Sequence, residues 1–338
     1  MSRLSYAQAL GLGLAEEMRR DPRVVVWGVD VGAYGGAFAV TKGLHDEFGS
    51  DRLIDMPISE LGFTGMAVGA AATGQRPVVE LQFSDWITLA SDQLINQAAK
   101  MRYMFGGLLS IPLVLRAPSG AYLRAGAQHS DSFESLLAYV PGLKVVYPAT
   151  PRDARGLLRS AIRDDNPVVF FEHKKLYGVK GEVPDDDELI PLGRARVARE
   201  GTDVTIVSYA LMVSFAEEAA ERLAADGISV EIIDLRTIAP LDVGAIVASV
   251  RKTHRLVVAQ EASLRFSVGS EISAIVAEEA FDALEAPIVR VAAKYAPIPF
   301  SPVLEDHVLP SVDDIEAAAR TVLRMAESIP GAAGVSGR

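Results

Sequence analysis

The chain has 338 residues, of which 49% are hydrophobic and 23% charged, with a net charge of −11 and no cysteine. This length and composition allow two cores of ordinary size and exclude wholesale disorder. The acidic balance argues against nucleic-acid binding, and the missing cysteines exclude disulfides and thiolate chemistry. Because no apolar run is long enough to span a bilayer, we expect a cytoplasmic protein with no membrane partner.

The first half of the chain predicts a parallel sheet buried on both faces. Its β-branched runs are apolar on successive residues instead of alternating, which is typical of such strands. Helical patterns lie between them, and residues 150–173 give a clear strand end, helix and next strand. The predicted strands are 24–30, 77–83, 111–118, 143–148 and 167–173.

A stretch rich in Gly, Pro and charge then interrupts the rhythm, and we take 181–201 as a linker. A second α/β series follows, with strands predicted at 203–210, 229–238, 255–261 and 287–293 and helices between them. The expected organisation is therefore two open, mostly parallel α/β domains, at 1–180 and 202–328. The small residues of 329–338 are expected to form a flexible tail.

Nucleotide-binding motifs fail in this sequence. Residues 11–16 read GLGLAE, which lies in a predicted helix instead of following a strand, and no GxxxxGK[ST] motif occurs. A nicotinamide-dependent or ATP-dependent enzyme therefore has little support.

Residues 55–66, DMPISELGFTGM, place Glu60 at the start of a helix made of small and apolar residues. Burial there would shift the pKa of the carboxyl group, as acid–base chemistry can require. However, the helix dipole alone also favours an acidic residue in a first turn. Gly62, Gly65 and Gly69 form a groove that suits either tight packing within the domain or a subunit interface. The local pattern favours the helix-dipole role for Glu60 and leaves the use of the groove open.

Two further segments carry candidates for chemistry. His129 lies in a glycine-containing loop, and histidine titrates most easily near neutral pH, although a lone loop histidine is commonly incidental. Residues 161–167, AIRDDNP, close a helix, where carbonyls beside Asp164 and Asn166 could hold a monovalent cation. The sequence alone favours an ordinary Asp/Asn/Pro turn for that segment.

The segments together resemble a known family. DMPISELGFTGMAVGAAATGQRPVVE, DQLINQAAKMRYMFGG, AQHSDSFESLLAYVPGLKVVYPATPRDARGLL and DNPVVFFEHKKLYG are similar to the β subunit of the thiamine-diphosphate-dependent component of 2-oxo acid dehydrogenase complexes. VEIIDLRTIAPLD and APIVRVAA resemble its C-terminal domain. The resemblance implies a pyrimidine-binding fold followed by a transketolase C-terminal-like domain. Some segments lean toward acetoin dehydrogenase members, and QFSDW leans toward branched-chain members.

The resemblance also assigns roles to residues. It implies that Glu60 shares a proton with N1′ of the cofactor's aminopyrimidine, while Ile58, Gln82 and Trp86 line the pyrimidine pocket. It implies that His129 assists proton transfer when the acyl group moves to a lipoyl arm. Trp86 departs from the Phe or Tyr that the family often has. The positions that match a structural K⁺ site in some members are Leu113, Ala161, Asp164 and Asn166.

The function implied is a 2-oxo acid or acetoin dehydrogenase, an oxidoreductase that works as an α₂β₂ heterotetramer and delivers its acyl group to a lipoyl-bearing acyltransferase. The resemblance implies that the α subunit holds Mg²⁺ and the diphosphate through a GDG motif, which this sequence does not contain. Two alternatives remain: a non-catalytic assembly subunit of the same fold, and a self-sufficient transketolase-like enzyme. The sequence does not name the substrate.

Overall fold

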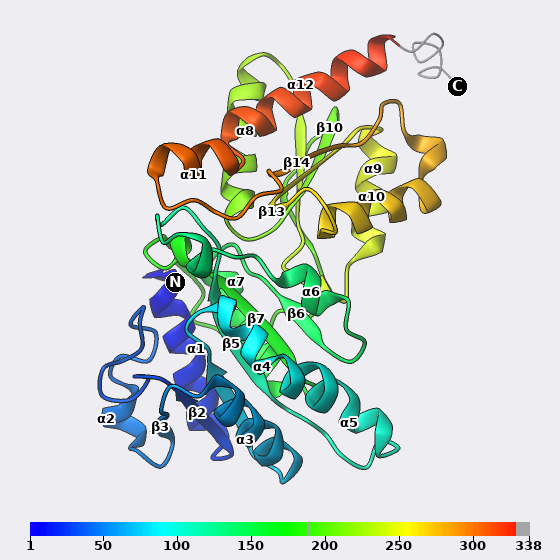
Figure 1. The fold of residues 1–338 in the computed structure, drawn as a ribbon. Coiled ribbons are helices and arrows are strands. Elements are labelled where there is room, and N and C mark those ends of the chain that lie inside the picture. The colour runs from blue at the N-terminus through cyan, green and yellow to red at the C-terminus, as the bar shows by residue number, and fades with distance from the viewer. Residues whose placement is uncertain (188, 329–338) are drawn as a thin grey trace. The chain divides into compact units, whose positions relative to one another are not determined.

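The computed structural model describes residues 1–187 and 189–328, so the tail expected at 329–338 lies outside the described residues. The chain forms two compact units. Unit 1 comprises Met1–Gly193 with Thr237–Pro240, and unit 2 comprises Arg194–Arg236 with the described residues from Leu241 onward. Each unit contains its own largely parallel sheet (Figure 1). Within the described ranges, no helix has the length and apolar character needed to cross a membrane.

Unit 1 is built on a seven-stranded sheet in the order β12-β6-β7-β5-β4-β2-β3. All neighbours are parallel except β12 and β6. The central strands are buried along their whole length, which explains their uninterrupted apolar runs. The predicted α/β class with open, mostly parallel sheets is confirmed. The strands are β2 (Val24–Gly28), β3 (Leu53–Asp55), β4 (Arg76–Glu80), β5 (Val114–Ser119), β6 (Lys144–Val146), β7 (Val168–His173) and β12 (Thr237–Ala239).

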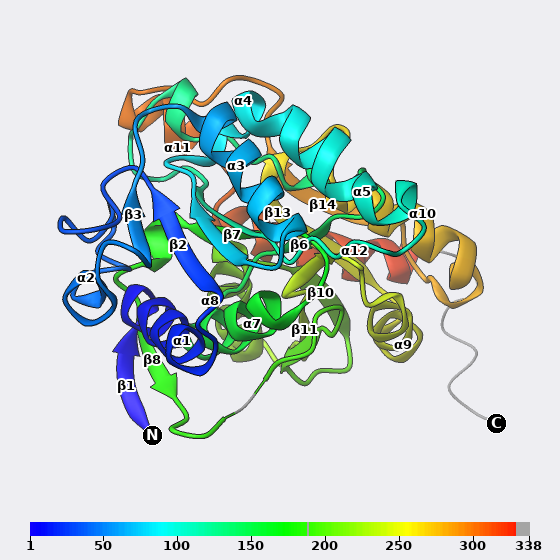
Figure 2. The ribbon, with the colours of Figure 1, turned by 90° about the horizontal axis from the view of Figure 1, so that it is seen from below.

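Helices cover both faces of this sheet. Figure 2 shows α1 (Tyr6–Arg20) and α7 (Pro151–Arg163) on one side, and α3 (Glu60–Ala72), α4 (Ile87–Ser91) and α5 (Ala99–Met104) on the other. A π-helical segment, Asp92–Ala98, connects α4 to α5. Shorter helices are α2 (Leu44–Phe48) and α6 (Glu134–Ala138), and β1 (Ser2–Ser5) pairs with β8 (Lys180–Val183) in a separate small sheet.

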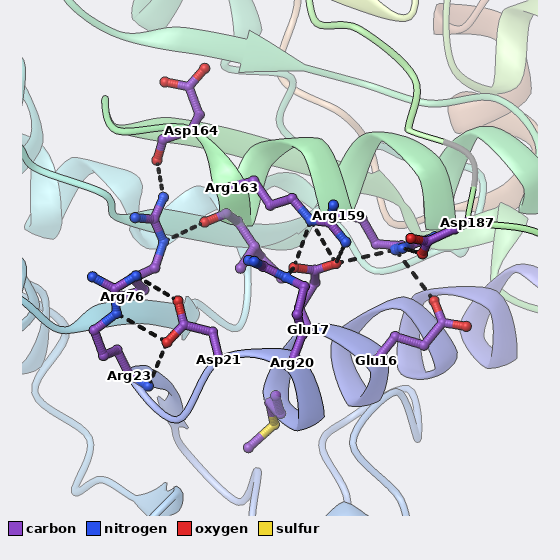
Figure 3. A network of polar contacts seen from close by, with 12 residues as sticks. Glu16, Glu17, Arg20, Asp21, Arg23, Arg76, Arg159, Arg163, Asp164 and Asp187 are labelled. Atoms are coloured by element: carbon purple, nitrogen blue, oxygen red, sulfur yellow. Dashed lines mark hydrogen bonds and ion pairs between the residues drawn. The ribbon is translucent and has the colours of Figure 1, made fainter.

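A buried ion network joins α1 to α7 (Figure 3). The carboxylate of Glu17 is fully buried and accepts hydrogen bonds from Arg163, Arg20 and Arg159 at 2.7–3.2 Å. Burial alone would raise the pKa of Glu17, but the bonds from these guanidinium groups outweigh it and hold the pKa below its usual value. Glu17 therefore stays ionised and contributes stability that is lost only as the pH falls through its lowered folded-state pKa.

Unit 2 is a five-stranded sheet in the order β14-β13-β10-β11-β9, parallel except for β9. Figure 1 shows α8 (Leu211–Ala225) and α12 (Val312–Ser328) on one face, with α9 (Val243–Thr253) and α10 (Val268–Glu279) on the other. A short helix, α11 (Pro302–Val308), precedes α12. The strands are β9 (Arg196–Arg199), β10 (Val204–Ser208), β11 (Val230–Asp234), β13 (Leu256–Ser263) and β14 (Val289–Ala293).

Two stretches differ from their predicted form. The predicted strand 229–238 ends at Asp234, whose carboxylate accepts the backbone N–H of Arg236 at 3.2 Å. Arg236 has a φ of +57°, which an extended strand cannot contain, so the chain turns there and Thr237–Ala239 pairs in unit 1. The stretch 181–201 is also not a bare linker, because it includes most of β8 and all of β9.

Candidate functional site

The parallel strands of unit 1 end at one edge of the sheet, and a polar side chain bridges two of those ends. β2 and β4 are neighbours, and the chain leaves β2 toward β3 but leaves β4 toward β5, on the opposite side. Such a switch point forms the ligand crevice in open α/β sheets. Gln82, just beyond β4, donates through Nε2 to the carbonyl of Val29, just beyond β2, at 3.1 Å. The same nitrogen donates to Oε1 of Glu80 at 2.7 Å. Gln82 is therefore fixed at the switch point.

Behind Gln82 lies a buried ionic network across β4, β5 and β7. Arg116 is fully buried and donates to Glu80 at 2.7 Å and to both carboxylate oxygens of Glu172 at 2.7 and 2.8 Å. The hydroxyl of Tyr177 donates to Glu172 at 2.6 Å. The bidentate geometry and the low exposure make this a strong, rigid set of bonds. It supports Gln82 through Glu80.

The protonation states of this network follow from burial and charge. Burial alone would lower the pKa of Arg116, but the charges of Glu172 and Glu80 raise it, so the guanidinium stays protonated. Burial raises the pKa of Tyr177 well above its ordinary value, and the Glu172 charge adds to this rise. Tyr177 is therefore a neutral donor at physiological pH.

Ring contacts bring His129 and Trp86 together. Trp86 lies in the turn η1 (Ser84–Trp86), and His129 ends the turn η3 (Ala127–His129). The His129 ring packs edge-on against Trp86 with centroids 5.9 Å apart and against Phe83 at 5.5 Å. Lys174 Nζ donates to the His129 carbonyl and lies 5.1 Å from the Phe83 ring centroid. Three separate segments thus meet around one imidazole.

Asp131 lies two residues beyond His129 and is partly buried. Burial, with a smaller contribution from the Asp85 charge, raises the pKa of the Asp131 carboxyl to about 6, although Lys174 opposes the rise. A carboxyl group with a raised folded-state pKa weakens folding once it ionises, because the unfolded chain ionises it more easily. Its destabilising effect therefore grows as the pH rises from 3.8 to about 6 and is constant above that.

We expect Asp131→Asn to stabilise the folded chain at pH 7 by on the order of 1 kcal/mol, allowing for partial solvent screening. The gain should shrink as the pH falls below about 6 and vanish below 3.8, where the Asp131 carboxyl is protonated in both the folded and the unfolded chain. Urea unfolding of both proteins across this pH range measures the difference. An equal gain at every pH would contradict the assigned shift.

Glu60 is the first residue of α3 and is only partly exposed. Its carboxylate forms no side-chain hydrogen bond or ion pair with any described residue. Ile58, in the turn between β3 and α3, is 81% exposed. Within the described chain no polar or ring contact joins Glu60 or Ile58 to Trp86 or His129. The structure therefore leaves an available carboxyl group at the mouth of α3 beside an uncovered apolar side chain.

α3 has two distinct faces. Its buried face packs inside unit 1 through Phe63, Ala67 and Val68 among others. Leu61 and Met66 on the other face are more than half exposed. A Cβ added at Gly69 would meet no atom within 4 Å, so nothing in the described chain requires glycine there.

The oxygens considered for K⁺ come from the start of β5 and the C-terminal end of α7, at Leu113, Ala161, Asp164 and Asn166. The Leu113 carbonyl accepts the N–H of Val168 at 2.8 Å, and the Ala161 carbonyl accepts that of Asp164 at 3.2 Å. The Asp164 carboxylate accepts hydrogen bonds from the side chains of Lys144 and Asn166. Its backbone carbonyl accepts one from Nη2 of Arg76 at 2.7 Å (Figure 3). A bound K⁺ would compete with two cationic side chains.

Comparison with known proteins identifies the family. The model of the transketolase pyrimidine-binding domain matches residues 2–180, and that of the transketolase C-terminal domain matches 193–315. The chain is 50% identical to an acetoin:2,6-dichlorophenolindophenol oxidoreductase subunit beta from Cupriavidus necator, over 95% of this chain and 98% of that one. The chain belongs to the transketolase-like family of dehydrogenase β subunits. This confirms the family that the sequence predicted.

Other members of the family have nearly the same similarity. Identity is 46% to the 2-oxoisovalerate dehydrogenase subunit beta of Bacillus subtilis (95% and 98% coverage) and 47% to the pyruvate dehydrogenase E1 component subunit beta of Rickettsia felis (94% and 98%). A solved structure titled "Split gene transketolase, inactive beta4 tetramer" matches with a TM-score of 0.79 at 25% identity, covering 96% of this chain and 99% of that one. These similarities fix the family and leave the substrate open.

The residues of the buried ionic network behind Gln82 were not predicted from the sequence. Glu80, Arg116 and Glu172 are charged residues in strands that are buried along their whole length and are otherwise largely apolar. In adjacent parallel strands such charges fall close together, and this pattern was available in the sequence. Asp85 gave no comparable signal, because the backbone groups it binds lie about 45 residues further along the chain.

Proposed function

We propose that this chain supplies the pyrimidine side of a thiamine-diphosphate site and that it acts in the cytoplasm with an α subunit as an α₂β₂ enzyme. The assembled enzyme would oxidise a short 2-oxo acid or acetoin and deliver the acyl group to a lipoyl-bearing acyltransferase. The observation that carries the proposal is the carboxyl group of Glu60, which no described residue binds, at the mouth of a helix in a pyrimidine-binding domain.

The residues present fit such a cofactor. When bound, thiamine diphosphate supplies the carbon nucleophile that adds to the substrate carbonyl. Glu60 would hold a proton at its carboxyl group and share it with N1′ of the pyrimidine, a general acid–base role. Trp86 would offer an aromatic face to the ring, and Ile58 would cover it once a partner encloses both. Gln82, held by Glu80, would present its amide oxygen.

The remaining roles divide between this chain and its partner. His129 would assist proton transfer as the acyl group moves to the lipoyl arm. Mg²⁺ and the diphosphate would belong to the α subunit, since the chain has no GDG motif. No group of three His, Asp or Glu side chains in the described ranges is arranged to hold a metal. The relative titled an inactive beta4 tetramer fits a β chain that needs its α partner for activity.

Co-expression with the α subunit, followed by assays on acetoin, pyruvate and 2-oxoisovalerate, tests this proposal. The measured rate is reduction of 2,6-dichlorophenolindophenol, with and without added thiamine diphosphate. We expect cofactor-dependent oxidation of at least one of these substrates. An assembled complex that oxidises none of them would favour the assembly-subunit alternative, and activity of this chain alone would favour the self-sufficient enzyme.

The exposed face of α3 is the part of this proposal that a single glycine can test. Gly69→Leu should not lower the stability of the chain, because a Cβ added there meets no atom within 4 Å and glycine is a poorer helix former than leucine by up to about 1 kcal/mol. If α3 lies in the subunit interface, the variant should fail to form the tetramer, as sizing of the co-expressed complex would reveal. Gly178→Leu, which also has open space, is the matched control and should assemble. Normal assembly of the Gly69 variant would contradict an interface role.

A further inference from the structure

The loop that carries His129 depends on other segments for its position. Residues 120–132 contain one short turn, η3, and two non-glycine residues with positive φ, Tyr122 at +63° and Arg124 at +59°. Conformations of this kind persist only where surrounding contacts impose them. Several of those contacts lie at the end of the loop, from His129 onward.

A single carboxylate fixes the two residues after His129. Oδ1 of Asp85 accepts the backbone N–H groups of Ser130 and Asp131, each at 3.1 Å. Asp85 is 6% exposed and Ser130 is 2% exposed, so these bonds form away from water. Ser119 Oγ donates to the Asp131 carbonyl at 3.2 Å and holds the same backbone from β5.

The same short segment supplies both the anchor and the surface on which the imidazole packs. Asp85 precedes Trp86 in η1, and Phe83 lies two residues before Asp85. The rings of Trp86 and Phe83 contact the His129 ring, while the Asp85 carboxylate holds the backbone that follows it. The residues 83–86 therefore hold both the ring of His129 and the backbone that follows it.

The second carboxylate oxygen of Asp85 is also unusual. Oδ2 of Asp85 is buried and has no hydrogen-bond partner in the described part of the chain. A buried carboxylate oxygen without a hydrogen-bond partner in the protein is unfavourable for folding, so its presence calls for an explanation beyond packing. The negative charge strengthens both bonds to Oδ1, as charge-assisted hydrogen bonds are stronger than neutral ones.

We propose that Asp85 is a positioning residue that sets the imidazole of His129 through the backbone of Ser130 and Asp131. This inference rests on the proposed function, in which His129 acts as the acyl group passes to the lipoyl arm. Loss of Asp85 should therefore slow the lipoyl-linked reaction more than the dye-linked reaction, which does not need that transfer. A misplaced general acid–base group of this kind loses rate without losing the fold.

The test compares two rates in the assembled enzyme: lipoyl-linked and 2,6-dichlorophenolindophenol-linked oxidation of its best substrate. Asp85→Ala should lower the ratio of these rates about tenfold, and Asp85→Asn, which keeps an oxygen acceptor without the charge, about threefold. In a His129→Ala background, Asp85→Ala should change the ratio by less than about twofold, because its effect passes through that imidazole.

Asp242→Ala is the matched control, because Asp242 also accepts two backbone N–H groups, those of Ala195 and Ala245, within unit 2. It should lower the melting temperature and leave the ratio unchanged. Equal loss of both rates in the Asp85 variants, or an additive loss with His129→Ala, overturns the inference while His129 keeps its role. An unchanged ratio in His129→Ala itself overturns the proposed role of His129 and this inference together. If Asp85→Ala does not assemble, a wild-type ratio in Asp85→Asn overturns it.

Discussion

Glu60→Gln is expected to lower the thiamine-diphosphate-dependent rate of the assembled enzyme by at least about 100-fold, the usual scale of general acid–base catalysis. Glutamine has the same shape but cannot exchange the proton that N1′ requires. Since no described residue hydrogen-bonds to the Glu60 carboxylate, the change removes no contact within this chain, and the fold should be retained. Steady-state rates with the dye acceptor, alongside thermal unfolding, measure both quantities.

The matched control is Glu271→Gln, because Glu271 also lies in the first turn of a helix, α10. A first-turn acid stabilises its helix by up to about 1 kcal/mol through the helix dipole. If Glu60 has only that role, the two variants should behave alike, with near-normal rates and slightly lower stability. A wild-type rate in Glu60→Gln would remove Glu60 from the chemistry.

Arg116→Met is expected to lower the free energy of unfolding by about 3–5 kcal/mol, the range measured when one member of a buried ion pair is removed. The methionine fills similar space, but Glu80 and Glu172 then lie buried without a cation. Both carboxyl groups should retain protons to higher pH in the folded variant than in the unfolded chain. The deficit should therefore shrink as the pH falls, since protonation removes the uncompensated charge.

Urea unfolding of the purified chain at two pH values measures this effect. Arg19→Met is the matched control, because Arg19 pairs with Glu47 at the surface, where both side chains are more than one-third exposed. Such pairs contribute at most about 1 kcal/mol. Equal, small losses in the two variants would show that the network around Arg116 is not a major source of stability.

Most of the fold could be predicted from the sequence because it depends on continuous burial. β4, β5 and β7 are covered on both faces, so their apolar runs identify them without any partner information. The return of Thr237–Ala239 to the first sheet could not be predicted, since a three-residue edge strand carries too little pattern. β1 and β8 could not be predicted for the same reason, because both strands are short. They also pair although most of the sequence of unit 1 lies between them.

Only part of the candidate site could be predicted from the sequence. Glu60, His129 and Trp86 came from a family resemblance that spans the chain, and the structure brings the last two together. The supports of those side chains were not predictable, because backbone groups such as the N–H of Ser130 leave no mark on a sequence. A carboxylate like that of Asp85 gains its partner only when the fold closes.

The most direct measurement of the central claim is calorimetric titration of thiamine diphosphate with Mg²⁺ into this chain alone and into the tetramer formed with its α subunit. If the chain supplies only the pyrimidine side of the site, the tetramer should bind the cofactor at least about 100-fold more tightly than the isolated chain. Equal, tight binding by the isolated chain would contradict the account, because the chain would then enclose the whole cofactor without a partner.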